Sequence, residues 1–200
     1  MKPEKYKGAI TREAFLFNES RLVAGLMLED LSKEEIVKRI VDENLFRYPT
    51  EKMVPSIAKT LVHRLSLPQD REVLRLIHDG FHSTAKQASL YCFMLDNLLV
   101  YEFLVDVIGS KYASLDLSFS KGDIHLYLDR IAMVDEKASK WSKLTKDKIR
   151  SVLVQTLVSV GYLDDPMATR LNPFQIDFQL LECIENDGNE DVLPAFNYRR

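Results

Sequence analysis

Apolar residues recur at helical spacing through most of the chain, and strand-like alternation is rare. Ile36, Val37, Ile40 and Val41 follow the i, i+3, i+4 spacing of an amphipathic helix. The helix has a clear start signal upstream, because "SKEE" begins with the capping box formed by Ser32 and the glutamate three residues later. Since such patterns recur along the chain, the sequence predicts a mainly α fold.

Two more short helices flank this one in the pattern. A helix over about 19–30 is predicted with Asn18 as its cap, and a third follows "RYP" with Thr50 as its cap. Pro55 falls in the first turn of the third helix, where a missing backbone N–H is tolerated. Three short helices with tight connections predict a helix-turn-helix-like unit over residues 1–68.

The middle of the chain is the most apolar part. After a short helix over 69–79, Gly80 is predicted in the left-handed cap position. A long helical region over 83–113 follows, with a break near residues 95–97. Charges at Asp96, Glu102 and Asp106 interrupt its apolar run, and charges are costly at the centre of a membrane span. This region is therefore predicted to form a buried core, with no membrane contact.

The C-terminal third predicts two helices and a β wing. The helices are expected over about 122–140 and 146–160, the second stopped by Gly161. The stretch "GYLDDPMATRLNPFQI" then alternates short apolar groups with Asp-Pro and Asn-Pro turn signals, as a two-stranded wing does. Residues 69–200 are thus predicted to form a helical core with a C-terminal winged-helix-like unit and a short β wing.

Charge is segregated along this part of the chain. Residues 137–150 hold six positive side chains against one aspartate, whereas residues 163–195 hold eight acidic side chains against one arginine. A local basic surface attracts phosphate even on an acidic molecule. The alternative is that the basic segment packs against the protein's own acidic tail. The candidate DNA-binding residues here are Lys140, Lys143, Lys146, Lys148 and Arg150.

The third predicted helix offers a second candidate surface. In a helix-turn-helix, the outward side of one helix carries the side chains that reach bases and phosphates. A polar outer face is also typical of any surface helix, and Glu34 and Glu35 on the preceding helix would repel phosphate. The candidates on this face, at about 100° per residue, are Lys52, Ser56, Lys59, Thr60, His63 and Arg64.

No set of residues predicts catalysis. His78 and His82 have the i, i+4 spacing of a zinc pair, but Gly80 is expected to end the helix between them, and no third ligand is in place. Asp164 and Asp165 fit a turn before a proline better than a metal-dependent nuclease site. The sequence thus predicts no enzyme, no metal, no cofactor and no small-molecule substrate.

The cellular location is predicted from two further features. The two cysteines are far apart in the sequence and lack metal-ligand spacing, which favours reduced thiols. The N-terminal segment "MKPEKYKGAITREAF" lacks the apolar stretch of a signal peptide. A cytoplasmic protein is therefore expected.

Two blocks together resemble the BrxA family of bacterial BREX phage-defence systems. They are "NESRLVAGLMLEDLSKEEIVKRIVDENLFRYPTEKMVPSIAKTLVHRL" and "KWSKLTKDKIRSVLVQTLVSVGYL". The resemblance implies a small, mainly helical, non-enzymatic protein that binds double-stranded DNA beside other BREX components. Pro55 departs from the pattern of the BrxA family in the third predicted helix. An alternative function is a protein–protein adaptor in the defence complex that does not bind DNA itself.

Overall fold

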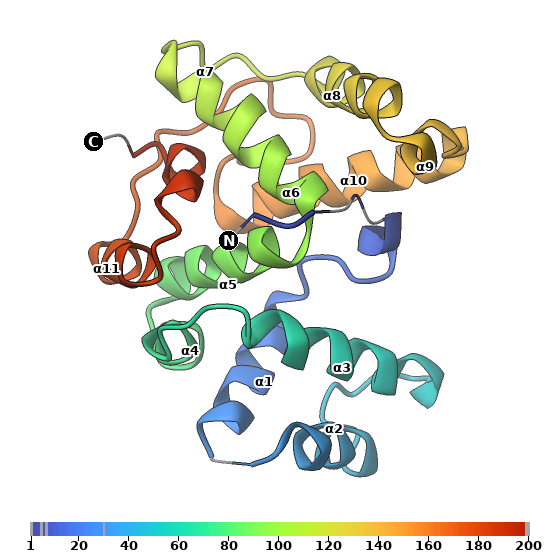
Figure 1. The fold of residues 1–200 in the computed structure, drawn as a ribbon, viewed down its shortest axis with the longest axis vertical. Coiled ribbons are helices and arrows are strands. Elements are labelled where there is room, and N and C mark those ends of the chain that lie inside the picture. The colour runs from blue at the N-terminus through green and yellow to red at the C-terminus, as the bar shows by residue number, and fades with distance from the viewer. Residues whose placement is uncertain (1, 5, 7, 30, 199–200) are drawn as a thin grey trace.

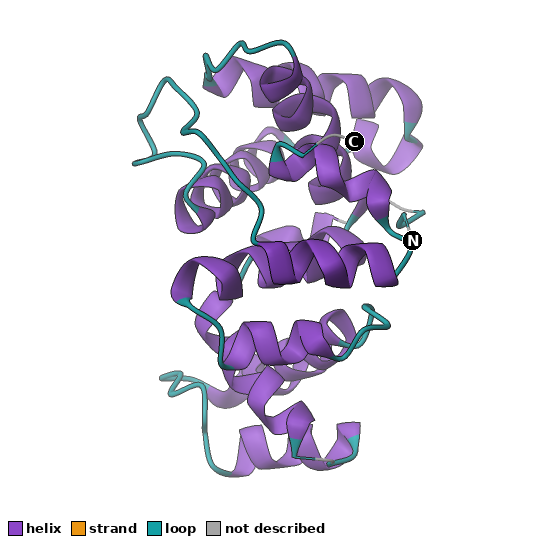
Figure 2. Cartoon of the chain, turned by 90° about the vertical axis from the view of Figure 1, so that its left-hand side faces the viewer, coloured by secondary structure: helices purple, strands orange, loops and turns teal. Residues whose placement is uncertain are grey.

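The computed structural model describes residues 2–4, 6, 8–29 and 31–198, and this part of the chain is built from helices and loops (Figures 1 and 2). The α-helices are α1 (Phe17–Leu28), α2 (Lys33–Asp42), α3 (Val54–Leu65), α4 (Glu72–His78), α5 (His82–Asp96), α6 (Leu98–Glu102), α7 (Gly109–Ala113), α8 (Lys121–Val134), α9 (Glu136–Ser139), α10 (Lys143–Val160) and α11 (Phe178–Asn186). Four tighter or wider helical turns are η1 (Gly8–Thr11), η2 (Glu51–Met53), η3 (Phe103–Ile108) and η4 (Glu190–Phe196). The predicted mainly α class is confirmed.

The predicted β wing is wrong. Within the described residues no strand forms, and the segment after Gly161 is an extended loop. This loop makes an isolated antiparallel bridge between Arg170 and Ser118, supported by a hydrogen bond from the Phe119 N–H to the Thr169 carbonyl. Turns do form after Gly161, but the segment pairs with the α7–α8 connection instead of folding into two paired strands. No winged-helix unit results.

The N-terminal helices follow the sequence pattern with two corrected caps. Ser32 and Glu35 form the predicted capping box of α2. At α1, however, Leu16 occupies the cap position with φ of 47°, and Asn18 lies inside the helix. Thr50 is not the cap of α3 either, because η2 intervenes and Met53 takes that place. Residues 43–53 separate α2 from α3, a longer connection than the roughly 3–4 residues of a helix-turn-helix.

Helices α5 to α7 form the centre of the core. From Ala88 to Leu95 every side chain of α5 is buried, and the helix breaks at the predicted place, where the Asn97 side chain caps α6. The prediction for Gly80 is wrong: α4 ends at His78 with Asp79 as its C-cap, and Gly80 has no left-handed φ. A Cβ added there would lie 2.3 Å from the Leu76 carbonyl oxygen, so close packing explains that glycine.

One buried arginine holds the N-terminal segment onto this core. The guanidinium of Arg64, 1% exposed, donates to the Asp96 carboxylate at 3.2 Å and to the carbonyl oxygens of Glu13 at 2.8 Å and Ala14 at 2.9 Å. It also lies over the Phe93 ring at 4.3 Å. Burial lowers the pKa of Arg64, and the charge of Asp96 opposes that shift. The segment 8–16, which we call the N-terminal strap, is thereby tied to α3 and α5.

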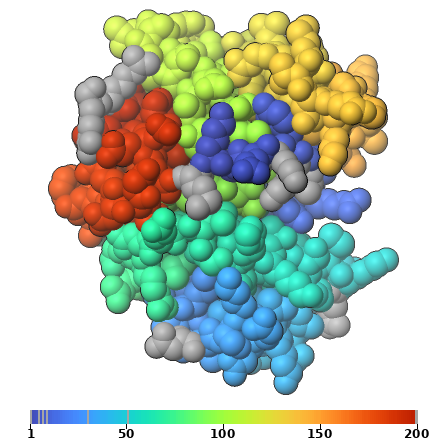
Figure 3. Space-filling model, viewed as in Figure 1, coloured from blue at the N-terminus to red at the C-terminus, as the bar shows by residue number. Residues whose placement is uncertain are grey.

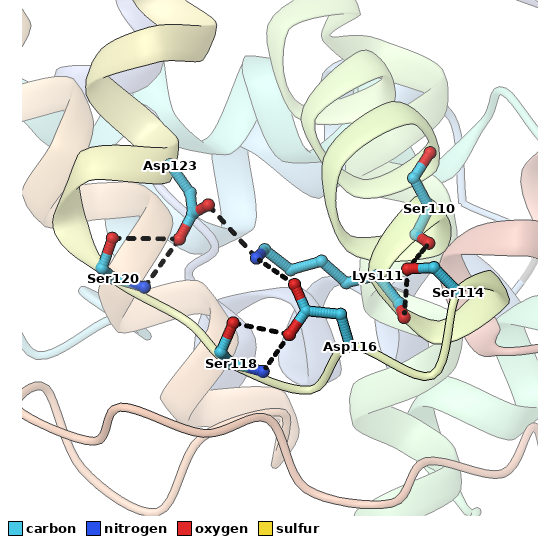
Figure 4. Close-up of polar contacts among 7 residues, drawn as sticks. All are labelled: Ser110, Lys111, Ser114, Asp116, Ser118, Ser120 and Asp123. Carbon is cyan, nitrogen blue, oxygen red and sulfur yellow. Dashed lines mark hydrogen bonds and ion pairs between the residues drawn. The ribbon is translucent and has the colours of Figure 1, made fainter.

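The connection before α8 is fixed by two carboxylates around one lysine (Figure 4). Lys111 Nζ lies 3.2 Å from Asp123 and 3.7 Å from Asp116. Each aspartate also accepts hydrogen bonds from a nearby serine, Ser120 and Ser118 respectively. Because its charges are already partnered, this cluster serves to set the start of α8.

The C-terminal helices begin and end close to the predicted places. The helix predicted over 122–140 is divided at Asp135 into α8 and α9, because the Asp135 side chain caps the second piece. Helix α10 begins three residues earlier than predicted, at Lys143, because Ser142 accepts a hydrogen bond from the Thr145 N–H. Gly161, with φ of 99°, ends α10 as predicted.

The apolar core is continuous across the molecule and contains residues from the strap to η4. Helices α1 and α3 pack on α4 and α5, so contacts cross the predicted boundary at residue 68. Among the described residues no helix is long and apolar enough to cross a membrane.

Candidate nucleic-acid interface

The lysine-rich segment is carried by a helix whose opposite side is anchored in the core. Ile149, Leu153 and Leu157 of α10 are each at most 1% exposed. Burial of such side chains stabilises a fold by about 1.5–3 kcal/mol each. The start of α10 is therefore a fixed platform for the charges on its outer side.

Local carboxylates partner more than half of the predicted cations. Lys140 lies 2.5 Å from Glu136, Lys146 lies 3.1 Å from Asp129, and Arg150 lies 3.0 Å from Asp147. Arg150 also contacts His125 Nε2 at 2.6 Å. By contrast, Lys143 and Lys148 are exposed and make no ion pair with the described part of the chain. Among the five candidate residues of this segment, only Lys143 and Lys148 are therefore without an ion pair in the described part of the chain.

The acidic tail does not cover these lysines. Helix α11 packs on α4 and α5, and η4 packs on η3 and α7. In Figure 1 these elements lie at the left, whereas α9 and the start of α10 lie at the right. In the described residues no ion pair joins the lysine-rich segment to residues 163–195. The alternative in which the two segments neutralise each other is therefore not how the chain folds.

The predicted face of α3 is divided by the fold. Lys52, Ser56, Lys59 and His63 are exposed and Thr60 is half-buried, as the helical pattern predicts. The placement of Arg64 on this face is wrong, since its side chain points into the core. Arg64 lies at the edge of the polar arc, and its contacts with Asp96 and two carbonyl groups draw it inward.

Ser56 of the predicted α3 face and Thr145 at the start of α10 line one groove, which we call the strap groove, with a volume of about 540 Å³. Its lining comes from α3, α10 and the N-terminal strap between them: Gly8, Thr11, Arg12, Glu13, Met53, Ser56, Ile57 and Thr145. Figure 1 shows η1, in dark blue, between α3 and the start of α10. Trp141, one of the partly buried residues on the core, lies against Gly8, where a Cβ would be 3.4 Å from the indole Nε1.

Sequence reasoning missed the contribution of the strap. Arg12 is exposed and makes no ion pair with the described residues, so it adds a cation to the groove. Thr11 and Thr145 add hydroxyl groups. No local signal marks these residues, because the strap has no amphipathic period and only the tertiary structure brings it to α10.

Lys59 and His63 lie on a different groove, between α2 and α3, with a volume of about 500 Å³. We call it the α2–α3 groove. It is lined by Lys33, Glu34, Val37, Lys38, Lys59, Val62 and His63. Two of the predicted DNA-contacting residues are thus separated from Ser56, which faces the strap groove.

The structure describes no metal cluster: within the described residues, no group of three or more His, Cys, Asp or Glu side chains could hold an ion. His78 ends α4 and contacts the Arg21 carbonyl at 3.3 Å, whereas His82 begins α5.

Cys92 and Cys183 are both buried free thiols, and burial raises the pKa of Cys183 to about 12.

Known proteins match nearly the whole length of this chain. Residues 4–188 match the family model BrxA. A BREX protein BrxA of Bacillus cereus (strain H3081.97) is 26% identical over 170 residues, covering 85% of this chain and 84% of that protein. A BREX protein BrxA of Paramagnetospirillum magneticum (strain ATCC 700264 / AMB-1) is 24% identical over 199 residues, covering 96% of each.

The fold also has a counterpart among solved structures. The crystal structure of an uncharacterized protein from Magnetospirillum magneticum superposes with a TM-score of 0.82 at 22% identity, covering 96% of this chain and 98% of that one. This similarity extends to the whole helical arrangement. From the match of residues 4–188 to the family model, the chain belongs to the BrxA family.

Proposed function

We propose that this protein is a non-enzymatic, DNA-binding component of a BREX-type phage-defence system. Membership of the BrxA family, with relatives named as BREX proteins, supports the role in defence. The observation that carries DNA binding is the strap groove, because Arg12 lines it and the elements that bear Lys52 (η2) and Lys143 and Lys148 (α10) border the same hollow. A duplex lying across the groove would contact both.

Phosphate groups are the expected partners on this surface. Arg12, Lys52, Lys143 and Lys148 are cations without an ion pair among the described residues, and they lie on the strap, η2 and the first turns of α10. Hydroxyl groups on both sides of the groove can donate to phosphate oxygens. Lysine is a point charge, whereas base reading favours the fork of arginine or the amides of asparagine and glutamine. Binding is therefore expected to be only weakly sequence-selective.

The charges within the groove also orient the duplex. Glu13 lines the hollow and would repel a phosphate at its own end. Thr145 lines the same groove from the first turn of α10, near the positive end of the helix dipole. The phosphate backbone is therefore expected to follow the α10 side, with Lys143 and Lys148 nearby.

The test is a fluorescence-anisotropy titration of a random-sequence duplex over a series of salt concentrations. The double variant Lys143→Ala/Lys148→Ala should bind more weakly, and its slope of log K against log salt should shrink by about 0.9 for each phosphate that the variant no longer neutralises. A matched control is Arg75→Ala/Lys121→Ala, which removes two charges on other elements. Equal behaviour of the two double variants, or binding insensitive to salt, would contradict the proposal.

Absence of catalysis is part of the same proposal. The described carboxylates and histidines of this chain do not converge on a cation as a metal-dependent nuclease centre requires. Duplex DNA incubated with the purified protein and Mg²⁺ should stay uncut, and elemental analysis should find no stoichiometric zinc. One zinc per chain that disappears in His82→Ala would overturn this part.

An adaptor role is the second candidate, and one observation favours it. Several large apolar side chains are well exposed, including Phe81, Met133 and Phe178. Such side chains gathered on a surface are typical of protein contacts. If no duplex binding occurs even at low salt, the adaptor role becomes the better explanation of this protein.

A further inference from the structure

Two phenylalanines at one corner of the molecule are unusually exposed. Phe81, directly before α5, is 88% exposed, and Phe178, the first residue of α11, is 68% exposed. The two lie on either side of a hydrogen bond from Thr84 Oγ1 to Asp177 Oδ2 of 2.6 Å, which joins the starts of α5 and α11. We call this feature the phenylalanine corner. Two large apolar side chains this exposed, on helix starts that are joined by a hydrogen bond, make the corner a candidate interaction site.

The charge around the phenylalanine corner is negative. Asp79, two residues before Phe81, has a side chain that is 71% exposed. Glu182 is exposed one helical turn after Phe178 on the same side of α11. The nearby Arg21 donates to the carbonyl oxygens of His78 and Gly80 and keeps its positive charge, but the carboxylates of Asp79, Asp177 and Glu182 outnumber it. A partner for this corner therefore needs an apolar depression with a cationic rim.

The α2–α3 groove has that complementary character. Val37 and Val62 supply apolar lining, and Lys33, Lys38, Lys59 and His63 supply the cations, with Glu34 as the acidic member of the lining. Lys38 and Lys59 make no ion pair with the described residues. In Figures 1 and 3 the groove's helices lie in the lower part of the molecule, away from the C-terminal segment on the left. One molecule cannot close this contact on itself.

We propose that the phenylalanine corner of one molecule docks into the α2–α3 groove of a second copy of this chain. The phenylalanine corner is aromatic with a negative rim, and the α2–α3 groove is apolar with a positive rim. Because both lie on the same chain at different places, a second copy supplies the complementary surface. Such a contact is head-to-tail, so each added copy leaves one phenylalanine corner and one α2–α3 groove free. Association produces open chains or rings.

The contact is small, and this sets its strength. Two phenylalanines bury about 150–250 Å² each, well below the roughly 800 Å² per partner of a standard interface. Self-association is therefore weak and concentration-dependent for the free protein. Copies held side by side on one DNA molecule would have a high effective concentration, so the same contact would make DNA binding cooperative.

The first experiment is sedimentation equilibrium of the full chain without DNA, from micromolar to near-millimolar concentration. The average mass of the wild type should rise with concentration and fall again at high salt, because opposite charges surround the contact. The knob variant Phe81→Ser/Phe178→Ser and the groove variant Lys38→Glu/Lys59→Glu should each associate about tenfold or more weakly. A control of similar exposure, Leu115→Ser/Leu126→Ser, should behave as the wild type.

The decisive experiment mixes the two defective variants. The knob variant retains an intact groove and the groove variant retains an intact knob, so the mixture should form dimers and nothing larger. Docking of a different protein would not restore association in the mixture, and a wild type that stops at dimers would indicate a two-fold symmetric contact instead. Unchanged urea unfolding verifies that each variant is folded, because exposed substitutions cost little stability. A wild type that stays monomeric throughout, or a mixture that does not dimerise, overturns the proposal.

Because no DNA is present in these measurements, their outcome is independent of the proposed DNA binding. If the protein self-associates and does not bind DNA, only the proposed function is refuted. If DNA binds with single-site behaviour and the protein stays monomeric, only the head-to-tail association is refuted.

Discussion

Helices α3 and α10 carry the two predicted sets of DNA-binding cations, and the positive side chains of the two helices differ in burial. Arg64 of α3 lies in the core between Asp96, two carbonyl groups and the Phe93 ring. Lys143 and Lys148 of α10 remain in solvent without an ion pair among the described residues. Similar amphipathic patterns thus lead to a buried structural arginine in one helix and to exposed lysines without a carboxylate partner in the other.

The difference comes from how each helix is surrounded. Helix α3 packs against α1, α2 and α5, and the strap crosses near its end, so only a narrow arc of its surface stays open. The first turns of α10 contact η1 and α8, and the remaining side is open. The position of a residue around a helix does not by itself determine its exposure. Arg64 is buried because a carboxylate and two carbonyl groups on the inner side accept its hydrogen bonds.

Arg64→Ala should have the largest effect of any single change that tests this comparison. It would leave Asp96 as a buried charge without its arginine and two strap carbonyls without a donor, and breaking a buried pair costs about 3–5 kcal/mol. The free energy of unfolding, measured in urea, should fall accordingly. Lys59→Ala on the exposed side of the same helix is the control and should change stability by less than about 0.5 kcal/mol. A small loss in Arg64→Ala would mean that the strap is not held through this residue.

Gly161→Ala tests the end of α10. The backbone there has φ of 99°, a conformation that costs an L-residue with a side chain roughly 1–2 kcal/mol. Thermal unfolding should reveal this loss. Gly161→Asn should lose less, because asparagine visits the left-handed region more readily. Equal losses in both variants would point to packing instead of backbone conformation, although no atom lies within 4 Å of a Cβ placed there.

Ser142→Ala tests the start of α10 against the start of α3. Ser142 accepts the Thr145 N–H, and loss of such a cap costs about 1 kcal/mol. Thr50→Ala is the matched change before α3, and it should leave stability nearly unaltered because Thr50 does not cap that helix. If Thr50→Ala proved as damaging as Ser142→Ala, the two helix starts would not differ as described.

The smallest expected contrast lies within the lysine-rich segment itself. Lys140→Ala/Lys146→Ala should reduce DNA affinity less than Lys143→Ala/Lys148→Ala, because the first two lysines already have carboxylate partners. Anisotropy titrations in one buffer measure both. Identical losses would indicate that these surface ion pairs exchange freely for phosphate, as weak exposed pairs can.

Much of the helical framework could be predicted from local patterns. The capping box at Ser32, the break at Asn97 and the stop at Gly161 each depend on a few neighbouring residues, and each prediction was confirmed. Predictions that depended on distant partners did worse. The wing segment pairs with the distant Ser118. One local prediction also failed, because Leu16 and not Asn18 takes the cap position of α1.

The candidate site shows the same division. Helical spacing placed Lys52, Ser56, Lys59 and His63 on the surface correctly. It could not show that Ser56 and Lys59 line different grooves, or that Arg12 joins the first of these. Neighbouring carboxylates such as Asp129, which reduce the free charge of the lysine-rich segment, also come from another helix.

The sequence by itself determined the helical class, the main starts and stops of its helices, and the separation of basic from acidic segments, because periodicity, capping and charge are local properties of the chain. Only the tertiary structure decided which cations are free, which are paired and which are buried. It also decided that the strap, α3 and α10 share one groove. The physical reason is that burial and electrostatic partnering depend on groups distant in sequence, and these are brought together only when the apolar core closes.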